Sequence, residues 1–119
     1  MSTTPLLPTL ENYLKLTVTR EQAISANMAN VDTPGYRTVG MDFEAEMRVA
    51  MDDVKSGHPP RKVRVTEVDG LIARPGGNNV SIDRESLQLA EAQLKFRTGV
   101  ALLRQEYQRV MDAIHADKS

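Results

Sequence analysis

The stretch LAEAQLKFRTGVALLRQEYQRVMDAI, residues 89–114, decides the fold class of this chain. Residues at alternating spacings of four and three form one stripe along it: Leu89, Gln93, Phe96, Val100, Leu103, Tyr107, Val110 and Ile114. Only Gln93 is polar, and this spacing is typical of a helix that packs lengthwise against another helix. It predicts a helix over about 83–116, capped by Ser81 or Asp83 and roughly 50 Å long at ~1.5 Å per residue.

The first part of the chain carries a similar pattern. Its stripe consists of Leu7, Leu10, Leu14, Thr17, Glu21, Ile24, Met28 and Val31. Pro5 and Pro8 suit a helix start and Thr9 is a plausible N-cap, so we predict a helix over about 9–30. We expect the two terminal helices to pack as a coiled coil. The polar positions Thr17, Glu21 and Gln93 would set its register.

The middle of the chain, 31–82, is predicted to hold a loop, a short helix and an extended segment. Apolar spacing after Asp42 indicates a helix near 42–54. Residues 62–68 begin with the alternation of a half-buried strand, and Asp69-Gly70 offers a turn into 71–73. We therefore expect a small hairpin or extended chain. The predicted whole is one mainly α domain over 1–119.

Composition excludes several classes of function. The 119 residues are 40% hydrophobic and 26% charged, which suits a single domain. Fifteen basic against sixteen acidic residues give a net charge of −1, which disfavours binding to nucleic acid or an anionic membrane. The chain has no cysteine, which excludes disulfides and thiolate sites. The start carries no signal-peptide pattern, and no apolar run approaches the roughly 20 residues of a membrane span.

The polar residues give no positive indication of an enzyme. His58 and His115 lack a partner at metal-ligand spacing, so we interpret both as solvated surface residues. The acidic residues of the middle helix are interpreted as solvating charge: Glu44, Glu46, Asp52 and Asp53. The glycine-rich stretch 75–79 is not followed by a GK[ST] sequence and is interpreted as a turn. We expect no catalytic residue, metal, cofactor or small-molecule substrate.

The segment ANMANVDTPGY, residues 26–36, is a helix exit with unusual chemistry. Ala26 and Ala29 allow a neighbour to approach the backbone closely. Asn27 and Asn30 carry amides that can bind the free carbonyls of the last turn or an adjacent chain. The remaining residues make a turn: Pro34 directs Thr33 to extended geometry, Gly35 permits a positive φ, and Tyr36 anchors the turn by its ring and hydroxyl.

Those eleven residues resemble the ANxANxxTPGY signature near the N-terminus of bacterial flagellar rod and hook proteins. The resemblance extends to the helices at both ends and the polar middle. The short length resembles a proximal rod subunit, because distal rod and hook proteins carry large inserted domains. Asp42-Phe43-Glu44 and the stretch GNNVSIDRE at 77–85 resemble one of the two short proximal rod types, and the other type stays open.

The resemblance implies a structural, self-assembling role. Proteins of this family are exported through the flagellar type III apparatus without a cleaved signal. They assemble with copies of themselves and other rod proteins on the inner-membrane ring and its adaptor, and form the drive shaft across the periplasm. The residues expected to take part are those of the signature, Ala26, Asn27, Ala29, Asn30, Thr33, Pro34, Gly35 and Tyr36, and the apolar residues of the two stripes.

Two other classes of function were weighed against this one. A cytoplasmic helical-hairpin adaptor would satisfy both stripes within one chain or a dimer, and would unfold cooperatively on its own. A small enzyme would depend on Asp52, Asp53 or His58, but no substrate suggests itself.

Overall fold

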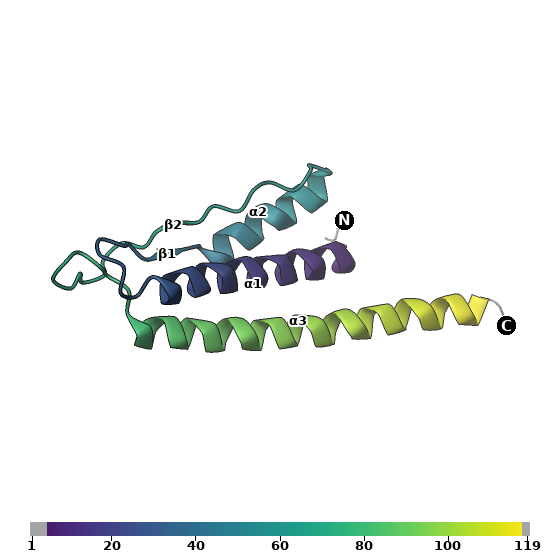
Figure 1. The fold of residues 1–119 in the computed structure, drawn as a ribbon. Helices are drawn as coiled ribbons and strands as arrows, with labels where there is room; N and C mark the ends of the chain where they lie inside the picture. Colours follow the sequence, from purple (N-terminus) through teal and green to yellow (C-terminus); the bar gives the residue numbers. More distant parts are fainter. Residues whose placement is uncertain (1–4, 118–119) are drawn as a thin grey trace.

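The structure, a computed structural model, describes residues 5–117. In chain order its elements are α1 (Leu6–Ala29), β1 (Val39–Gly40), α2 (Phe43–Ser56), β2 (Thr66–Glu67) and α3 (Ile82–Asp117). Helix α1 lies in the middle, with α2 on one side and the long α3 on the other (Figure 1). The molecule is elongated, 69 × 26 × 18 Å. Long terminal helices with a short helix and a small sheet between them confirm the predicted fold class.

Helix α1 begins earlier than predicted. Pro5 occupies the N-cap position, and Pro8 falls in the first turn, where its own missing N–H costs no hydrogen bond. Thr9 does not cap the helix, since its hydroxyl lies inside the first turn and donates to the Pro5 carbonyl at 2.7 Å. The N-cap prediction was therefore wrong, because two prolines at the start let the helix begin without a side-chain cap.

Helix α3 matches its predicted bounds to within one residue. Ser81, not Asp83, caps it, with the Arg84 amide 3.3 Å from the Ser81 hydroxyl. The helix runs antiparallel to α1 (Figure 1). Its buried residues recur every seven positions, at Glu85, Ala92, Gly99 and Glu106. At Gly99 the helices come so close that a Cβ atom would lie 2.7 Å from Leu14 Cδ2 and 2.9 Å from the Tyr13 ring.

This packing corrects the predicted face of α3. The residues that face α1 are small or acidic, and Gln93, Phe96, Tyr107 and Ile114 of the predicted stripe are exposed. The side chains of α1 at this contact are bulky, so close approach requires small residues on α3. Gln93 therefore cannot set the register of the α1–α3 pair. Thr17 is fully buried, and its hydroxyl donates a hydrogen bond to the Leu14 carbonyl at 2.7 Å.

Helix α2 has clear start and stop signals. The Asp42 carboxylate accepts from the Ala45 amide at 3.1 Å, and Gly57 ends the helix at φ 71°. The helix thus covers 43–56, close to the predicted 42–54. Phe43 meets the Tyr13 ring edge-on at 5.5 Å and lies under the Lys95 ammonium at 4.9 Å, so it joins all three helices.

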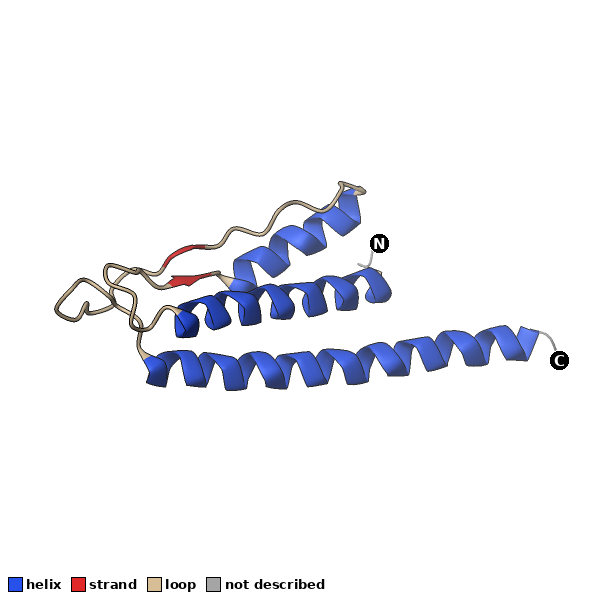
Figure 2. Ribbon diagram, viewed as in Figure 1, coloured by secondary structure: helices blue, strands red, loops and turns tan. Residues whose placement is uncertain are grey.

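The predicted hairpin between 62–68 and 71–73 was wrong in its partner. Thr66–Glu67 instead pairs antiparallel with Val39–Gly40. After Gly57 the chain runs back alongside α2 and brings β2 next to β1 (Figure 2). A Cβ at Gly40 would lie 3.0 Å from Val68 Cγ2, so a glycine suits this close approach. Residues 71–73 have no strand in the described chain.

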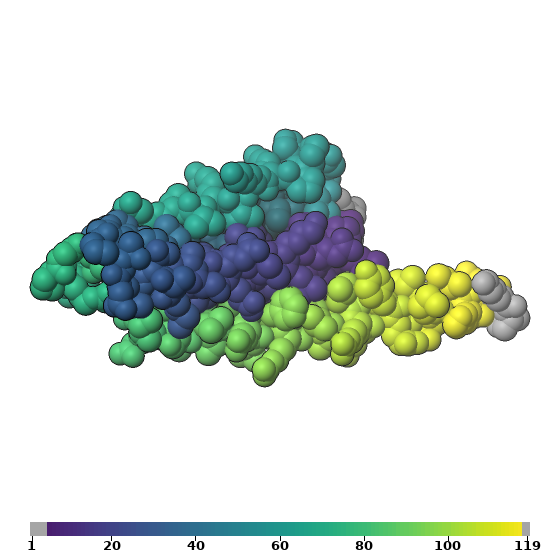
Figure 3. Space-filling view, in the orientation of Figure 1, coloured from purple at the N-terminus to yellow at the C-terminus, as the bar shows by residue number. Residues whose placement is uncertain are grey.

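The C-terminal third of α3 projects beyond the rest of the molecule. In the space-filling view it extends past the start of α1 with α1 no longer beside it (Figure 3). The spacing agrees, since Gly99 lies opposite Tyr13 and α1 begins only seven residues before Tyr13. The last ten residues of α3 therefore gain little burial within the described chain.

Candidate assembly surfaces

Asn27 is the centre of a buried hydrogen-bond network at one end of the molecule. Its side chain is 1% exposed and uses all of its bonding capacity. The amide nitrogen donates to the Val39 carbonyl at 2.8 Å and to Glu85 Oε2 at 3.1 Å. The amide oxygen accepts from the Val39 amide at 2.9 Å and from the Tyr36 hydroxyl at 3.1 Å. One side chain thus joins α1, the turn, β1 and α3.

The stretch 77–80 supplies the other half of this end of the molecule. Asn78, buried, donates to the carbonyls of Asn30 and Thr33, both at 2.8 Å. Asn79, also buried, accepts from the Thr38 amide at 2.6 Å. Residues 26–40 and 74–85, which we call the tip, are therefore held together by side-chain amides bonded to backbone groups.

An arginine and a pair of glycine turns complete the tip. Arg74 donates to the carbonyls of Val31 and Val80, at 2.5 Å for Val80. The Gly35 amide donates to the Gly76 carbonyl at 2.9 Å, and both glycines have positive φ, 74° and 97°. These conformations favour glycine, so the close contact of the two turns depends on residues without a Cβ.

The electrostatics of the tip are those of a structural network. Glu85 is fully buried, and it accepts from Asn27 and from Arg84 Nη1, the latter at 2.6 Å. Burial raises the pKa of Tyr36 above its usual value, and the nearby Glu85 charge adds to the increase. Tyr36 therefore stays protonated and donates its hydrogen bond at neutral pH. The buried amides of Asn27 and Asn78 have all their donors and acceptors in use, whereas the Asn79 amide nitrogen has no partner within the described chain. A buried polar network of this kind specifies one geometry.

The structure confirms most of the chemistry expected of the signature. Asn30 donates to the Ala26 carbonyl at 2.8 Å, as expected of an amide at a helix exit. The Thr33 hydroxyl donates to Asn30 Oδ1 at 3.0 Å, and Gly35 has the expected positive φ. Ala26 and Ala29 are exposed, so within this chain the expected close backbone approach does not occur at them.

The two predicted apolar stripes differ in how deeply they are buried. That of α1 faces inward: Leu10 and Ile24 are buried, and Leu7, Leu14 and Met28 are half-buried. On α3 only part of the stripe is covered, because Leu89, Val100, Leu103 and Val110 are half-buried and the other apolar members are exposed. Tyr107 is 49% and Ile114 43% exposed. A further apolar line on α3 is exposed throughout: Leu87, Ala90, Leu94, which is 67% exposed, and Ala101.

Asp53 corrects one of the charge interpretations. It is buried, not solvated, and both of its carboxylate oxygens accept from Arg61 Nε at 3.1 Å. His58 Nδ1 lies 3.7 Å from Asp53 Oδ1. The hydrogen bonds from Arg61 are the main cause of a lowered pKa of Asp53. This cluster ties the return segment after α2 to the helix. Hydrophobic periodicity could not predict that Asp53 is buried, because Arg61 reaches it only after the chain turns back along α2.

The polar residues of the tip loop were also missed as a group. Sequence reasoning interpreted 75–79 as an ordinary turn, whereas Asn78 and Asn79 are buried and bonded to the signature. Two adjacent asparagines after two glycines were the available signal, but only the folded chain shows which backbone groups they bind.

Residues 5–117 contain neither a metal-binding cluster nor a membrane-spanning helix. No cluster of three or more histidine and acidic side chains in this part of the chain is arranged to hold a metal ion. None of the helices described here is long and apolar enough to cross a bilayer.

Sequence comparisons give relatives over most of the chain. It is 32% identical over 122 aligned positions to the flagellar basal body rod protein FlgB of Salmonella typhimurium, with 87% of this chain and 88% of the relative covered. It is 28% identical to the protein of that name from Yersinia ruckeri, covering 87% and 89%. It is 27% identical to that from Escherichia coli, covering 89% and 90%. No family model matches the chain.

Proposed function

The chain belongs to the FlgB family of flagellar basal body rod proteins, and from this premise we propose that it is a self-assembling structural subunit of the proximal rod. Its work would be to transmit torque across the periplasm as part of the drive shaft. It would have no catalytic role and bind no cofactor.

The observation that carries this proposal is the uncovered apolar surface of α3. Leu87 and Leu94 are 63% and 67% exposed, and Tyr107, Met111 and Ile114 are each more than two-fifths exposed. Exposed apolar surface along a helix marks an interaction surface. A helical-hairpin adaptor that buried the apolar stripes of both helices within one chain would not leave these side chains so exposed.

The contrast between the terminal helices and the tip supports different roles for the two regions. The terminal helices would form layers of a tube and carry load through many repeated contacts. The tip would fix the angle between α1 and the chain that follows it, since Asn27 bonds to α3 and β1 together. Torque would then not depend on any single residue.

The partners that we propose follow from this role. They are other copies of the chain, other rod proteins, the inner-membrane ring with its rod adaptor, and the flagellar type III export apparatus during delivery. Export would proceed without cleavage of a signal peptide. All relatives reported above are of the FlgB type, which favours that type over FlgC, the other short proximal rod protein.

A gene deletion with complementation tests the proposal. We expect cells lacking the gene to lose swimming and to have basal-body rings without rods in electron micrographs, and the wild-type gene to restore both. Normal swimming with intact rods, in a strain without a duplicate gene, would overturn the rod assignment. Intact rods in the deletion strain, together with cooperative unfolding of the purified chain, would favour the helical-hairpin adaptor.

A further inference from the structure

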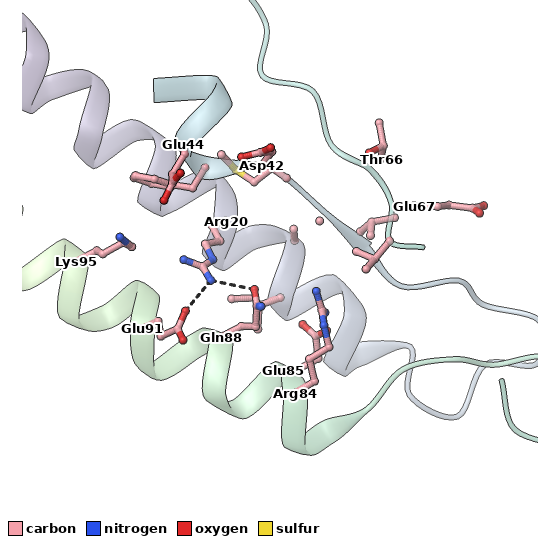
Figure 4. A pocket seen from close by; sticks show the side chains of 17 residues that line it. Arg20, Asp42, Glu44, Thr66, Glu67, Arg84, Glu85, Gln88, Glu91 and Lys95 are labelled. Atoms are coloured by element: carbon pink, nitrogen blue, oxygen red, sulfur yellow. Dashed lines mark hydrogen bonds and ion pairs between the residues drawn. The ribbon is translucent and has the colours of Figure 1, made fainter. Parts of the chain in front are cut away.

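A groove opens where the tip meets the first half of α3. It is lined by α1, α3, β1, β2 and the start of α2 and has a volume of about 500 Å³ (Figure 4). Among its lining residues Ala23, Ile24, Val39 and Gly40 are apolar or small. Arg20 crosses between the helices and donates to Gln88 and Glu91, each at 3.0 Å. The groove is therefore partly apolar with polar edges.

The edge formed by β1, β2 and α2 carries uncompensated negative charge. Asp42, Glu44 and Glu67 line it and are exposed. No ion pair within the described chain involves any of the three. Three cations line the groove as well: Arg20 pairs with Glu91, Arg84 pairs with Glu85, and the Lys95 ammonium lies over the Phe43 ring at 4.9 Å. The acidic residues of the lining still outnumber the basic ones. A ligand of this groove should carry positive charge beside an apolar face.

The second half of α3 has that combination. Its apolar residues at helical spacing, which we call the distal stripe, are Val100, Leu103, Tyr107, Met111 and Ile114. Arg97 and Arg104 flank this stripe, seven residues apart and hence on one side of the helix. Both are exposed, and neither has an ion-pair partner in the part of the chain described by the structure.

We propose that the distal stripe of one copy docks in the groove of a second copy, with Arg97 and Arg104 facing Glu44 and Glu67. This rests on the proposed function, since it names the contact by which subunits join. The distal stripe cannot fill the groove of its own chain. The α3 residues that line the groove lie within 84–95 and the distal stripe lies within 100–114, in different halves of one straight helix (Figure 1). The contact joins two different surfaces, so successive copies continue in one direction unless the rotation closes a ring.

Charge exchange tests the ionic part of the contact in cells. Arg104→Glu alone and Glu67→Arg alone are each expected to abolish rods in basal-body preparations. Their combination is expected to restore rods, because the pair is rebuilt with opposite signs. Arg48→Glu and Glu11→Arg are matched controls on exposed residues away from both surfaces and should leave rods unchanged. Thermal midpoints of all variants should match that of the wild type.

Cysteine cross-linking tests the apolar part of the contact directly. The natural chain has no cysteine, so any disulfide comes from the introduced pair. Met41→Cys in the groove and Tyr107→Cys on the distal stripe should give linked multimers in isolated rods, and neither variant alone should give a dimer. Dimers of Tyr107→Cys alone would show two distal stripes in contact and would overturn the proposal. Assembled rods without a crosslink, or charge exchange without rescue, would overturn it and leave the rod assignment intact.

Discussion

The tip and the distal half of α3 differ in the kind of side chain that they bury and expose. In the tip, buried amides of Asn27, Asn78 and Asn79 bind backbone groups within the chain. In the distal half, a regular helix leaves Tyr107 and Ile114 without cover. Polar side chains thus fix the shape of the tip, whereas the distal half of α3 leaves apolar side chains exposed. Polar networks specify geometry, whereas apolar surface supplies free energy to whatever covers it.

The largest effect on stability is expected from removing the centre of the tip. Asn27→Ala leaves the Val39 carbonyl, the Tyr36 hydroxyl and Glu85 without their shared partner in a buried site. We expect a loss of about 3 kcal/mol in the free energy of unfolding. Urea denaturation measures it. Asn30→Ala, at a less buried amide, is the control, and an equal loss in both variants would contradict the central role of Asn27.

A somewhat smaller effect is expected where the two long helices touch. Gly99→Leu places a side chain where even a Cβ would lie 2.7 Å from Leu14. Overpacking of this kind should cost about 2 kcal/mol in the free energy of unfolding. Ala101→Leu introduces the same final side chain on the exposed side of α3 and should be close to neutral. A neutral Gly99→Leu in thermal unfolding would mean that α3 does not approach α1 so closely.

The Asp53–Arg61 pair predicts a defined dependence on pH. Because the pKa of Asp53 is lowered below its usual 3.8, the ionised carboxylate stabilises the fold above that pH. This stabilisation is lost as the pH falls through the folded-state pKa. Asp53→Asn should be less stable than the wild type at pH 7, and the difference should shrink below about pH 4. Urea midpoints across this range measure it, with exposed Asp52→Asn as the control.

The smallest effect on stability, with a large effect on assembly, is expected in the distal half of α3. Ile114→Ser removes an exposed apolar side chain, so the free energy of unfolding should change by less than about 0.5 kcal/mol. Swimming and rod number should nevertheless fall, since the covering partner would lose apolar contact. The neighbouring His115→Ser is the control. Unimpaired swimming with Ile114→Ser would place the assembly contact elsewhere.

Local signals in the sequence predicted the elements well. The heptad spacing gave α3 to within one residue, and Asp42 marked the start of α2 through its own capping bond. Asn30 behaved as its local chemistry predicts, because its partner, the Ala26 carbonyl, lies only four positions earlier. Gly35 has the predicted positive φ.

Predictions failed where a residue's partner comes from far along the chain. The strand partner of β2 was wrong because Val39 lies on the other side of α2. Asp53 looked like solvated charge because Arg61 reaches it only after the chain reverses at Gly57. Asn78 and Asn79 looked like turn residues because their backbone partners, the Asn30 carbonyl and the Thr38 amide, lie more than forty positions earlier.

The helices and part of the chemistry of the helix exit followed from the sequence alone, because periodicity and short-range hydrogen bonds act over a few residues. Only the tertiary structure decided which face of α3 meets α1. The apolar stripe was the obvious choice, but the bulky side chains of α1 admit the line of Ala92 and Gly99 instead. Packing density at the helix contact made that choice, and it left Leu94, Tyr107 and Ile114 of α3 exposed.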